Sequence, residues 1–140
     1  SKFIRMKLCK LLIICFLCSF YSYSQILIGY HEDDIIDYIE ENYTDFMLST
    51  GSFAGTTNAV KFESQDGDKT LMFFLNDENI CNHSKLMLDI EVFDQTIKTL
   101  DKKYKNLGEN KWLTVKDGEE YVLSIQKTSW MFSIVTQKKE

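Results

Sequence analysis

The most regularly patterned stretch of this sequence is FDQTIKTLDKKYKNLG, residues 93–108. Its apolar side chains recur at steps of four, three, four and three residues, which places them on one face of an α-helix. We predict a helix from Phe93 to Gly108, with Asp94 as its N-cap and Gly108 at its carboxyl end. Such a helix must cover an apolar surface, which the rest of the chain has to supply. The stripe consists of Phe93, Ile97, Leu100, Tyr104 and Leu107.

The residues after this helix predict three strands joined by tight turns. Lys111–Val115 and Tyr121–Ile125 flank Asp117-Gly118, and Asp-Gly is a strong hairpin signal because both residues tolerate positive φ. A turn at residues 127–129 then leads into a third strand, Trp130–Ile134. Strands joined by such short turns pair antiparallel.

A helix also opens the first half of the chain. Residues 32–46 begin with three acids and continue with apolar residues at steps of three, four and three, so they predict a helix from Glu32 to Phe46. Ser49–Asn58 is rich in glycine, serine and threonine and predicts a loop. Upstream, Ile26–Ile28 predicts either an edge strand or a flap docked on the core. The stripe of this helix is Ile36, Ile39, Tyr43 and Phe46.

Three more strands are predicted between the two helices. Val60–Ser64 alternates in polarity up to Asp66-Gly67, a second hairpin signal. Lys69–Leu75 is apolar on both faces, which indicates a central strand. After a turn at residues 76–79, Ile80–Asp89 predicts the next strand.

Together these elements predict an α+β fold, an antiparallel sheet of about six strands with two helices on one face. This outline resembles the helix-on-curved-sheet pattern of TATA-binding-like and β-lactamase-inhibitor-like folds. Because each helix is followed by three strands, the chain also suggests two helix-strand-strand-strand repeats. When the two halves are aligned at their Asp-Gly turns, Leu71 corresponds to Val122, Phe74 to Ile125 and Cys81 to Phe132.

The first 24 residues predict a cleaved secretory signal peptide, which leaves residues 25–140 as a single domain. Basic residues precede an apolar run, Leu11–Phe20, and Ser22 and Ser24 occupy the −3 and −1 positions of a cleavage site before Gln25. A membrane anchor is the alternative, but ten apolar residues are fewer than the roughly twenty that a membrane span needs. Lipid attachment at Cys15 or Cys18 is a further alternative, although neither cysteine follows a small residue.

The exported protein would therefore be secreted or periplasmic. It would retain one cysteine, Cys81, and form no internal disulfide. A signal that ends in Ser-Gln, an acidic helix start and Asp-Gly hairpins together resemble small secreted proteins of Bacteroidetes-type bacteria. This resemblance is one of overall pattern, and it carries over no functional residues.

The charge balance excludes several classes of partner. The whole chain has a formal charge of −5, and removal of the four basic residues before residue 25 leaves 12 bases against 21 acids, a net charge of −9. An acidic domain does not suit DNA, RNA or anionic membrane surfaces, which are bound by neutralising phosphates. The only arginine, Arg5, would be lost with the signal, so no bidentate guanidinium clamp would remain.

Cys81 and His83 are the sharpest catalytic candidates. Two residues apart on a predicted strand, they would share a face and could form a thiolate–imidazole pair, although about 7 Å separates such neighbours. A lone cysteine is more often a small buried hydrophobe.

Metal and phosphate motifs are weaker candidates. His31 and His83 lack zinc-site spacing, and the acidic turns at residues 66–68 and 76–79 do not match a calcium loop. The segment Gly51–Gly55 lacks the lysine of a phosphate loop. We assign no catalytic, cofactor-binding or metal-binding residue.

Aromatic residues gather in the last three strands. Those that face away from the helices would form an exposed patch, which soluble monomers rarely keep without a partner. We therefore predict an exported, non-enzymatic domain that binds an unknown protein or small ligand through its uncovered sheet face or an edge strand. The alternatives are a small hydrolase-like or ligand-processing enzyme that uses acids and His83, and an envelope structural component. The aromatic residues are Trp112, Tyr121, Trp130 and Phe132.

Overall fold

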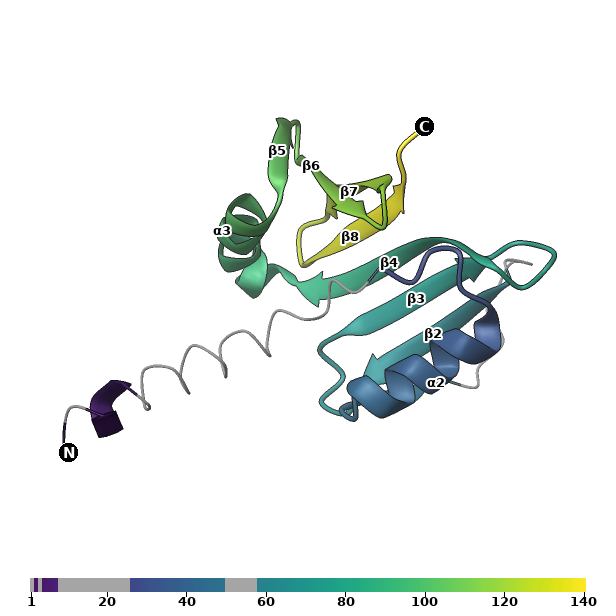
Figure 1. Cartoon of the computed structure of the whole chain (residues 1–140), viewed down its shortest axis with the longest axis horizontal. Helices are drawn as coiled ribbons and strands as arrows, with labels where there is room; N and C mark the ends of the chain where they lie inside the picture. The colour runs from purple at the N-terminus through teal and green to yellow at the C-terminus, as the bar shows by residue number, and fades with distance from the viewer. Residues whose placement is uncertain (1, 3, 8–25, 50–57) are drawn as a thin grey trace.

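The computed structural model describes residues 2, 4–7, 26–49 and 58–140. In the described residues from Ile26 onward, a helix and four strands are followed by a second helix and four more strands (Figure 1). The first half comprises α2 (Glu32–Asn42), β1 (Phe46–Leu48), β2 (Ala59–Ser64), β3 (Thr70–Leu75) and β4 (Cys81–Asp89). The second half comprises a 3₁₀ turn, η2 (Ile90–Val92), then α3 (Phe93–Lys103), β5 (Lys105–Gly108), β6 (Lys111–Lys116), β7 (Glu119–Lys127) and β8 (Met131–Lys138).

All eight strands form one antiparallel sheet in the order β1-β2-β3-β4-β8-β7-β6-β5. The two halves meet at the centre, where β4 pairs with β8 over seven residue pairs, from His83 opposite Gln137 to Asp89 opposite Met131. The α+β class is confirmed. The predicted number of about six strands was wrong, because the sheet has two further edge strands, β1 and β5. The sequence pattern places Phe46 of β1 and all of β5 in the predicted helices.

The second helix is shorter than its apolar pattern predicts. α3 ends at Lys103, Tyr104 has an extended backbone, and residues 105–108 pair with β6 as an edge strand. Gly108 does have positive φ, but as the last residue of β5, just before the turn to β6, and not at a helix end. Pairing with β6 therefore outweighs the local preference for another helical turn.

The start of this helix also differs from the prediction. Asp94 is not the N-cap, because α3 continues directly from η2 and its N-cap, Val92, makes no side-chain hydrogen bond. The capping carboxylate is Asp89, which accepts a hydrogen bond of 2.8 Å from the amide of Glu91 at the start of η2. Asp94 lies in the first turn of α3, where its negative charge suits the helix dipole.

The first helix begins at Glu32 as predicted but stops at Asn42, four residues before Phe46. Its N-cap is His31, whose Nδ1 accepts a hydrogen bond of 3.2 Å from the amide of Asp33. Phe46 is buried all the same, because it opens β1 opposite Ser64 of β2.

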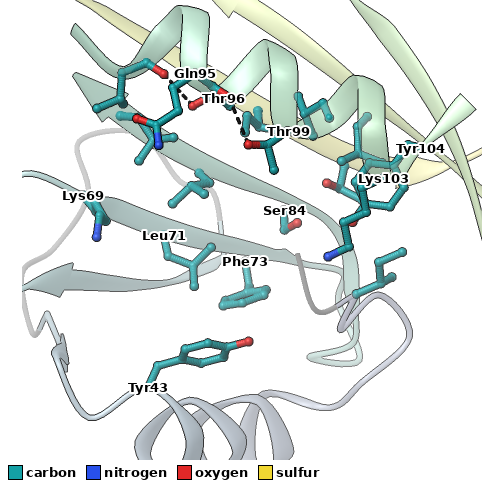
Figure 2. Close-up of a pocket in the computed structure, with 18 of the residues that line it drawn as sticks. Tyr43, Lys69, Leu71, Phe73, Ser84, Gln95, Thr96, Thr99, Lys103 and Tyr104 are labelled. Atoms are coloured by element: carbon teal, nitrogen blue, oxygen red, sulfur yellow. Dashed lines mark hydrogen bonds between the residues drawn. The ribbon is translucent and has the colours of Figure 1, made fainter. Parts of the chain in front are cut away.

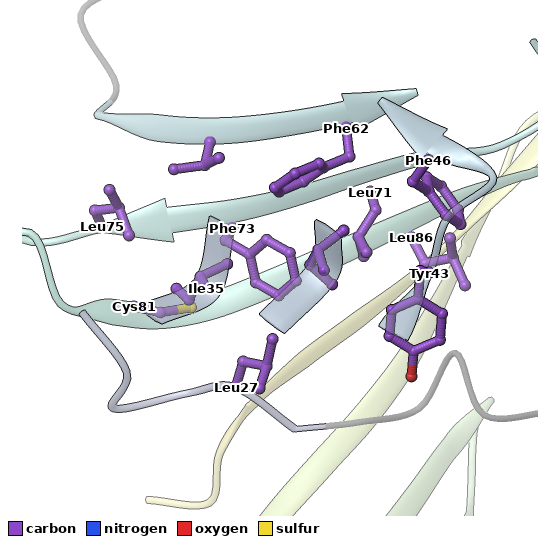
Figure 3. Close-up of a cluster of buried hydrophobic side chains, with 12 residues drawn as sticks. Leu27, Ile35, Tyr43, Phe46, Phe62, Leu71, Phe73, Leu75, Cys81 and Leu86 are labelled. Carbon is purple, nitrogen blue, oxygen red and sulfur yellow. The ribbon is translucent and has the colours of Figure 1, made fainter. Parts of the chain in front are cut away.

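Both helices pack on one face of the sheet. Ile35 and Ile39 of α2 lie over β2, β3 and the start of β4 (Figure 3). Leu100 of α3 packs on Trp112 and Leu123 of β6 and β7. Alternate residues of a strand, and residues paired directly across strands, lie on the same face of the sheet. The register from β2 to β6 therefore places the residues that contact α2 and those that contact α3 on one face. The two clusters meet at Ile134 of β8, which contacts both.

Both halves have the same order of elements, with four strands after each helix and not the predicted three, but they do not correspond residue by residue. Leu71 faces the helices, whereas Val122 lies on the opposite face, since its neighbour Leu123 contacts α3. Phe74 and Ile125 are likewise on opposite faces. Counting from the Asp-Gly turns was therefore wrong as a structural alignment.

Residues 26–30 form the predicted flap and not the alternative edge strand. We call this segment the N-terminal flap (Ile26–Tyr30). Leu27 is buried in the cluster beneath α2, and the flap exchanges backbone hydrogen bonds with Cys81, from Gly29 N to Cys81 O at 2.8 Å and from Cys81 N to Tyr30 O at 2.9 Å. Lys116 holds it from the other half of the sheet, donating to the carbonyl of Ile26 at 2.6 Å.

A carboxylate on α3 connects the helix to the buried tryptophan. Trp112 is 1% exposed, and its indole N–H donates to Asp101 at 2.9 Å. This hydrogen bond, and a second one of 2.8 Å from the Asn106 amide, hold the pKa of the Asp101 carboxyl below its usual value.

The Asp101 contact predicts a pH dependence of stability. A carboxyl whose pKa is lower in the folded state contributes stability above its unfolded pKa of about 4, and this contribution is lost as the pH falls through the folded pKa. We expect the unfolding midpoint of the wild type to fall more steeply below pH 4 than that of Asp101→Asn, followed by near-ultraviolet circular dichroism. Equal slopes in the two proteins would contradict the contact.

Candidate functional site

A cavity of about 390 Å³ lies on the helix-covered face of the sheet, between α2 and α3. Figure 2 shows α3 on one side of it, Tyr43 at the end of α2 on the other, and Leu71 and Phe73 of β3 between them. Its volume falls in the range of about 300–1,000 Å³ that is typical of small-molecule sites.

The cavity exists because two helices are too narrow for an eight-stranded sheet. Seven gaps between strands at about 4.8 Å make the sheet about 34 Å wide, whereas two helices of about 10 Å each cover about 20 Å. The uncovered middle falls on β4 and β8, whose Leu86, Leu88 and Ile134 line the cavity.

The walls are predominantly apolar, and both helices and the sheet contribute to them. α2 and the residue after it supply Ile39 and Tyr43, β3 supplies Leu71 and Phe73, and α3 supplies Leu100. An apolar enclosed surface favours an apolar ligand, because burial of such surface away from water is the main favourable term in binding.

Polar groups on α3 are directed mainly to the helix itself. The Thr96 hydroxyl donates to the Val92 carbonyl at 2.7 Å, and the Thr99 hydroxyl donates to the Gln95 carbonyl at 3.0 Å (Figure 2). Each hydroxyl has a single proton, so these two lining residues have no further proton to donate to a ligand.

The charged residues that line the cavity are two lysines, Lys69 and Lys103, and the described part of the lining contains no carboxylate. Lys103 extends from the last turn of α3, with its ammonium 5.4 Å from the centre of the Tyr104 ring. Lys69 lies near Asp66, whose pKa is lowered mainly by hydrogen bonds from Ser64 and Asp68 and also by the charge of Lys69.

Cys81 and His83 do not share a face, in contrast to the prediction. The register between β3 and β4 shifts between Phe74, opposite His83, and Leu75, opposite Cys81. This β-bulge adds one residue, so Cys81 enters the buried cluster with Leu75 (Figure 3). His83 instead stacks on Phe74 on the far face, with ring centroids 4.3 Å apart. A thiolate–imidazole pair cannot form in this geometry.

The environments of the two residues are also unlike those of a catalytic pair. Burial raises the pKa of the Cys81 thiol to about 12, and burial lowers the pKa of His83. His83 contacts Asn82 through its Nδ1. It adjoins a shallow hollow whose described lining contains one acidic residue, Glu140, so the cleft of several carboxylates that the enzyme alternative requires is missing there.

The candidate metal ligands are separate and already bonded. His31 caps α2, and His83 stacks on Phe74. The carboxylate of Asp66 accepts from Ser64 at 2.6 Å, and the amide oxygen of Asn76 accepts from the backbone of Glu78 and Ile80. Among the described residues no group of three His, Cys, Asp or Glu side chains is placed to hold a metal ion.

The sheet face away from the helices is open and mixed in character. Trp112, Tyr121 and Phe132 are all buried on the helix side, so they form no aromatic patch on the open face. Trp130 is 69% exposed, but it lies in the turn between β7 and β8. Charged residues interrupt the open face, among them the pair Lys61–Glu63 at 2.8 Å.

Two sequence predictions lie outside the described residues. Residues 8–25 hold the apolar core and cleavage site of the predicted signal peptide, and residues 50–57 hold the segment Gly51–Gly55. No helix in the part of the chain that is described has the length and apolar character needed to cross a bilayer.

Comparisons with protein-family models, with curated proteins and with solved structures found no match to this chain.

Proposed function

We propose that the protein is an exported, non-enzymatic binding domain that holds an aliphatic small molecule in the cavity between α2 and α3. The observation that carries this proposal is the cavity itself, an apolar space of about 390 Å³ framed by two helices on a sheet. Binding domains commonly combine such an apolar space with a few polar groups. This proposal replaces the open sheet face as the binding surface, because that face lacks the predicted aromatic patch.

The size of the cavity indicates the size of the ligand. At roughly 30 Å³ for each non-hydrogen atom, the volume that a water molecule takes in the liquid, about 390 Å³ holds about a dozen such atoms. A ten-carbon chain with one polar end has this size. We therefore use 1-decanol as the probe, since it tests the apolar cavity without any charge.

The proposed function predicts that 1-decanol binds and raises the melting temperature, since a ligand bound only by the folded state stabilises it. A larger side chain that fills the cavity should prevent the binding of 1-decanol and the rise in melting temperature. Ser84 lines the cavity from β4, and we expect Ser84→Leu to weaken decanol binding at least tenfold in isothermal titration calorimetry.

The matched control is Ser124→Leu, which makes the same substitution on β7. Ser124 pairs with Val135 on the open face and does not line the cavity, so decanol affinity should be unchanged. Absence of decanol binding to the wild type, or equal loss in both variants, would contradict the proposed function.

A further inference from the structure

We infer that the ligand of this cavity is an anionic amphiphile, an aliphatic chain with a carboxylate or phosphate head group placed beside Lys103. This inference rests on the proposed function and adds the chemical class of the ligand. It is carried by the charges that line the cavity, which are those of Lys69 and Lys103, with no acidic residue in the described lining.

The lining departs from the charge balance of the chain. The sequence has 21 acidic residues and 16 basic ones, so a surface of average composition would present more carboxylates than ammonium groups. The described lining instead presents two ammonium groups and no carboxylate. An anion would be repelled by the net charge of the protein but attracted by these two ammonium groups, which favours the cavity over a surface of average composition.

The position of Lys103 suits a head group at the mouth of the cavity. Lys103 is exposed and belongs to the last turn of α3, and Figure 2 shows its side chain extending from the helix toward the space above Phe73. The aliphatic part of a lysine side chain packs well on an apolar wall while its ammonium remains in water. Lys69 is the second choice, because the acidic side chain of Asp66 lies near it and would repel an anion.

Lys103 is the charged donor that α3 presents to the cavity, and two of the neutral polar residues on the same helix are bonded to its backbone. Thr96 and Thr99 have committed their hydroxyl protons to carbonyls of their own helix. An anionic head group needs hydrogen-bond donors. A lysine ammonium group carries three N–H donors, and its positive charge strengthens their hydrogen bonds to an anion. A cationic head group would meet two like charges here and no acid in the described lining.

The test compares three probes with the same ten-carbon chain by isothermal titration calorimetry: decanoate, 1-decanol and decylammonium. We expect the purified protein to bind decanoate about tenfold more tightly than 1-decanol, and to bind decylammonium more weakly than either. Lys103→Gln should reduce decanoate affinity to the level of 1-decanol and leave the affinity for 1-decanol unchanged.

The matched control is Lys102→Gln, which removes the same charge from the neighbouring residue of α3. Lys102 does not line the cavity, so the preference for decanoate should persist. Equal affinity for decanoate and 1-decanol would overturn the inference and leave the proposed function standing, whereas failure of all three probes would overturn both.

A further arm of the test distinguishes a free amphiphile from a membrane lipid. Because the cavity holds about a dozen non-hydrogen atoms, a single short chain fits and a two-chain phospholipid does not. We therefore expect no co-sedimentation with phosphatidylglycerol vesicles. Vesicle binding that is lost in Lys103→Gln would overturn the assignment to a free amphiphile.

Discussion

Replacing Phe62 by alanine is expected to lower the free energy of unfolding by about 3–5 kcal/mol, the usual cost of removing a large buried aromatic side chain. Phe62 is 0% exposed and lies in the middle of β2, opposite Leu71 of β3. Its ring meets that of Phe73 edge to face, with centroids 6.1 Å apart (Figure 3). Alanine would remove both this contact and the packing beneath α2, and leave a hole that the rigid sheet cannot fill.

Urea unfolding followed by circular dichroism measures this loss, with Met47→Ala as the control. Met47 is in the neighbouring strand β1 and is 59% exposed, so its truncation should change stability by no more than about 0.5 kcal/mol. A loss below about 1 kcal/mol in Phe62→Ala would show that the cluster beneath α2 is loosely packed. The same small loss in both variants would contradict the burial described above.

The hairpins were predictable because their turns are local. Asp117 and Gly118 both have positive φ, 51° and 78°, as a two-residue hairpin turn requires, and β6 and β7 pair directly from Lys116 opposite Glu119. The Asp-Gly pair at residues 66–67 lies in a longer connection from β2 to β3, in which Gly67 has a positive φ of 77° and Asp66 does not. In these segments a few adjacent residues determine the backbone conformation of the turn. The alternation of apolar and polar residues in the strands then determines which face is buried.

The edge strands were not predictable from periodicity. Tyr104 and Leu107 continue the helical spacing of α3, yet Lys105–Gly108 is a strand, since pairing with β6 provides hydrogen bonds that an isolated last turn of helix cannot match. The apolar stripe is consequently not wholly buried, and Leu107 is 46% exposed. The predicted helix of the first half is also too long, since α2 stops at Asn42 and Phe46 opens β1.

The cavity could not be predicted because it depends on how far the width of the sheet exceeds the width of the two helices. No single segment of the sequence determines either width. The bulge between β3 and β4 could not be predicted from the sequence either. One extra residue on β4 near Leu75 reverses the face on which the preceding residues of β4 lie. It separates Cys81 from His83, which strict alternation had placed together. A signal was present in the sequence, however, since six or more inward-facing apolar strands are more than two short helices can cover.

Cys81 should react with iodoacetamide about a thousandfold more slowly in the folded protein than in the unfolded chain at pH 8. The reactive species is the thiolate, and burial raises the pKa of the Cys81 thiol to about 12. An unperturbed thiol with a pKa of about 8.5 is about one-quarter thiolate at pH 8, whereas a pKa of about 12 leaves about one thiolate in ten thousand. The side chain is also only 2% exposed, so the reagent must wait for an opening of the core.

Mass spectrometry of the peptide that contains Cys81 measures this reaction separately from that of Cys9, Cys15 and Cys18, with the chain in concentrated guanidinium as the reference. Where modification requires unfolding, its rate follows the population of the unfolded state. Phe62→Ala should then accelerate the reaction by the same factor by which it raises the unfolding equilibrium constant, because both residues belong to the cluster beneath α2. Fast modification of folded Cys81 with a midpoint near neutral pH would instead indicate a thiolate activated by a nearby base, and would overturn the placement of Cys81 and His83 on opposite faces.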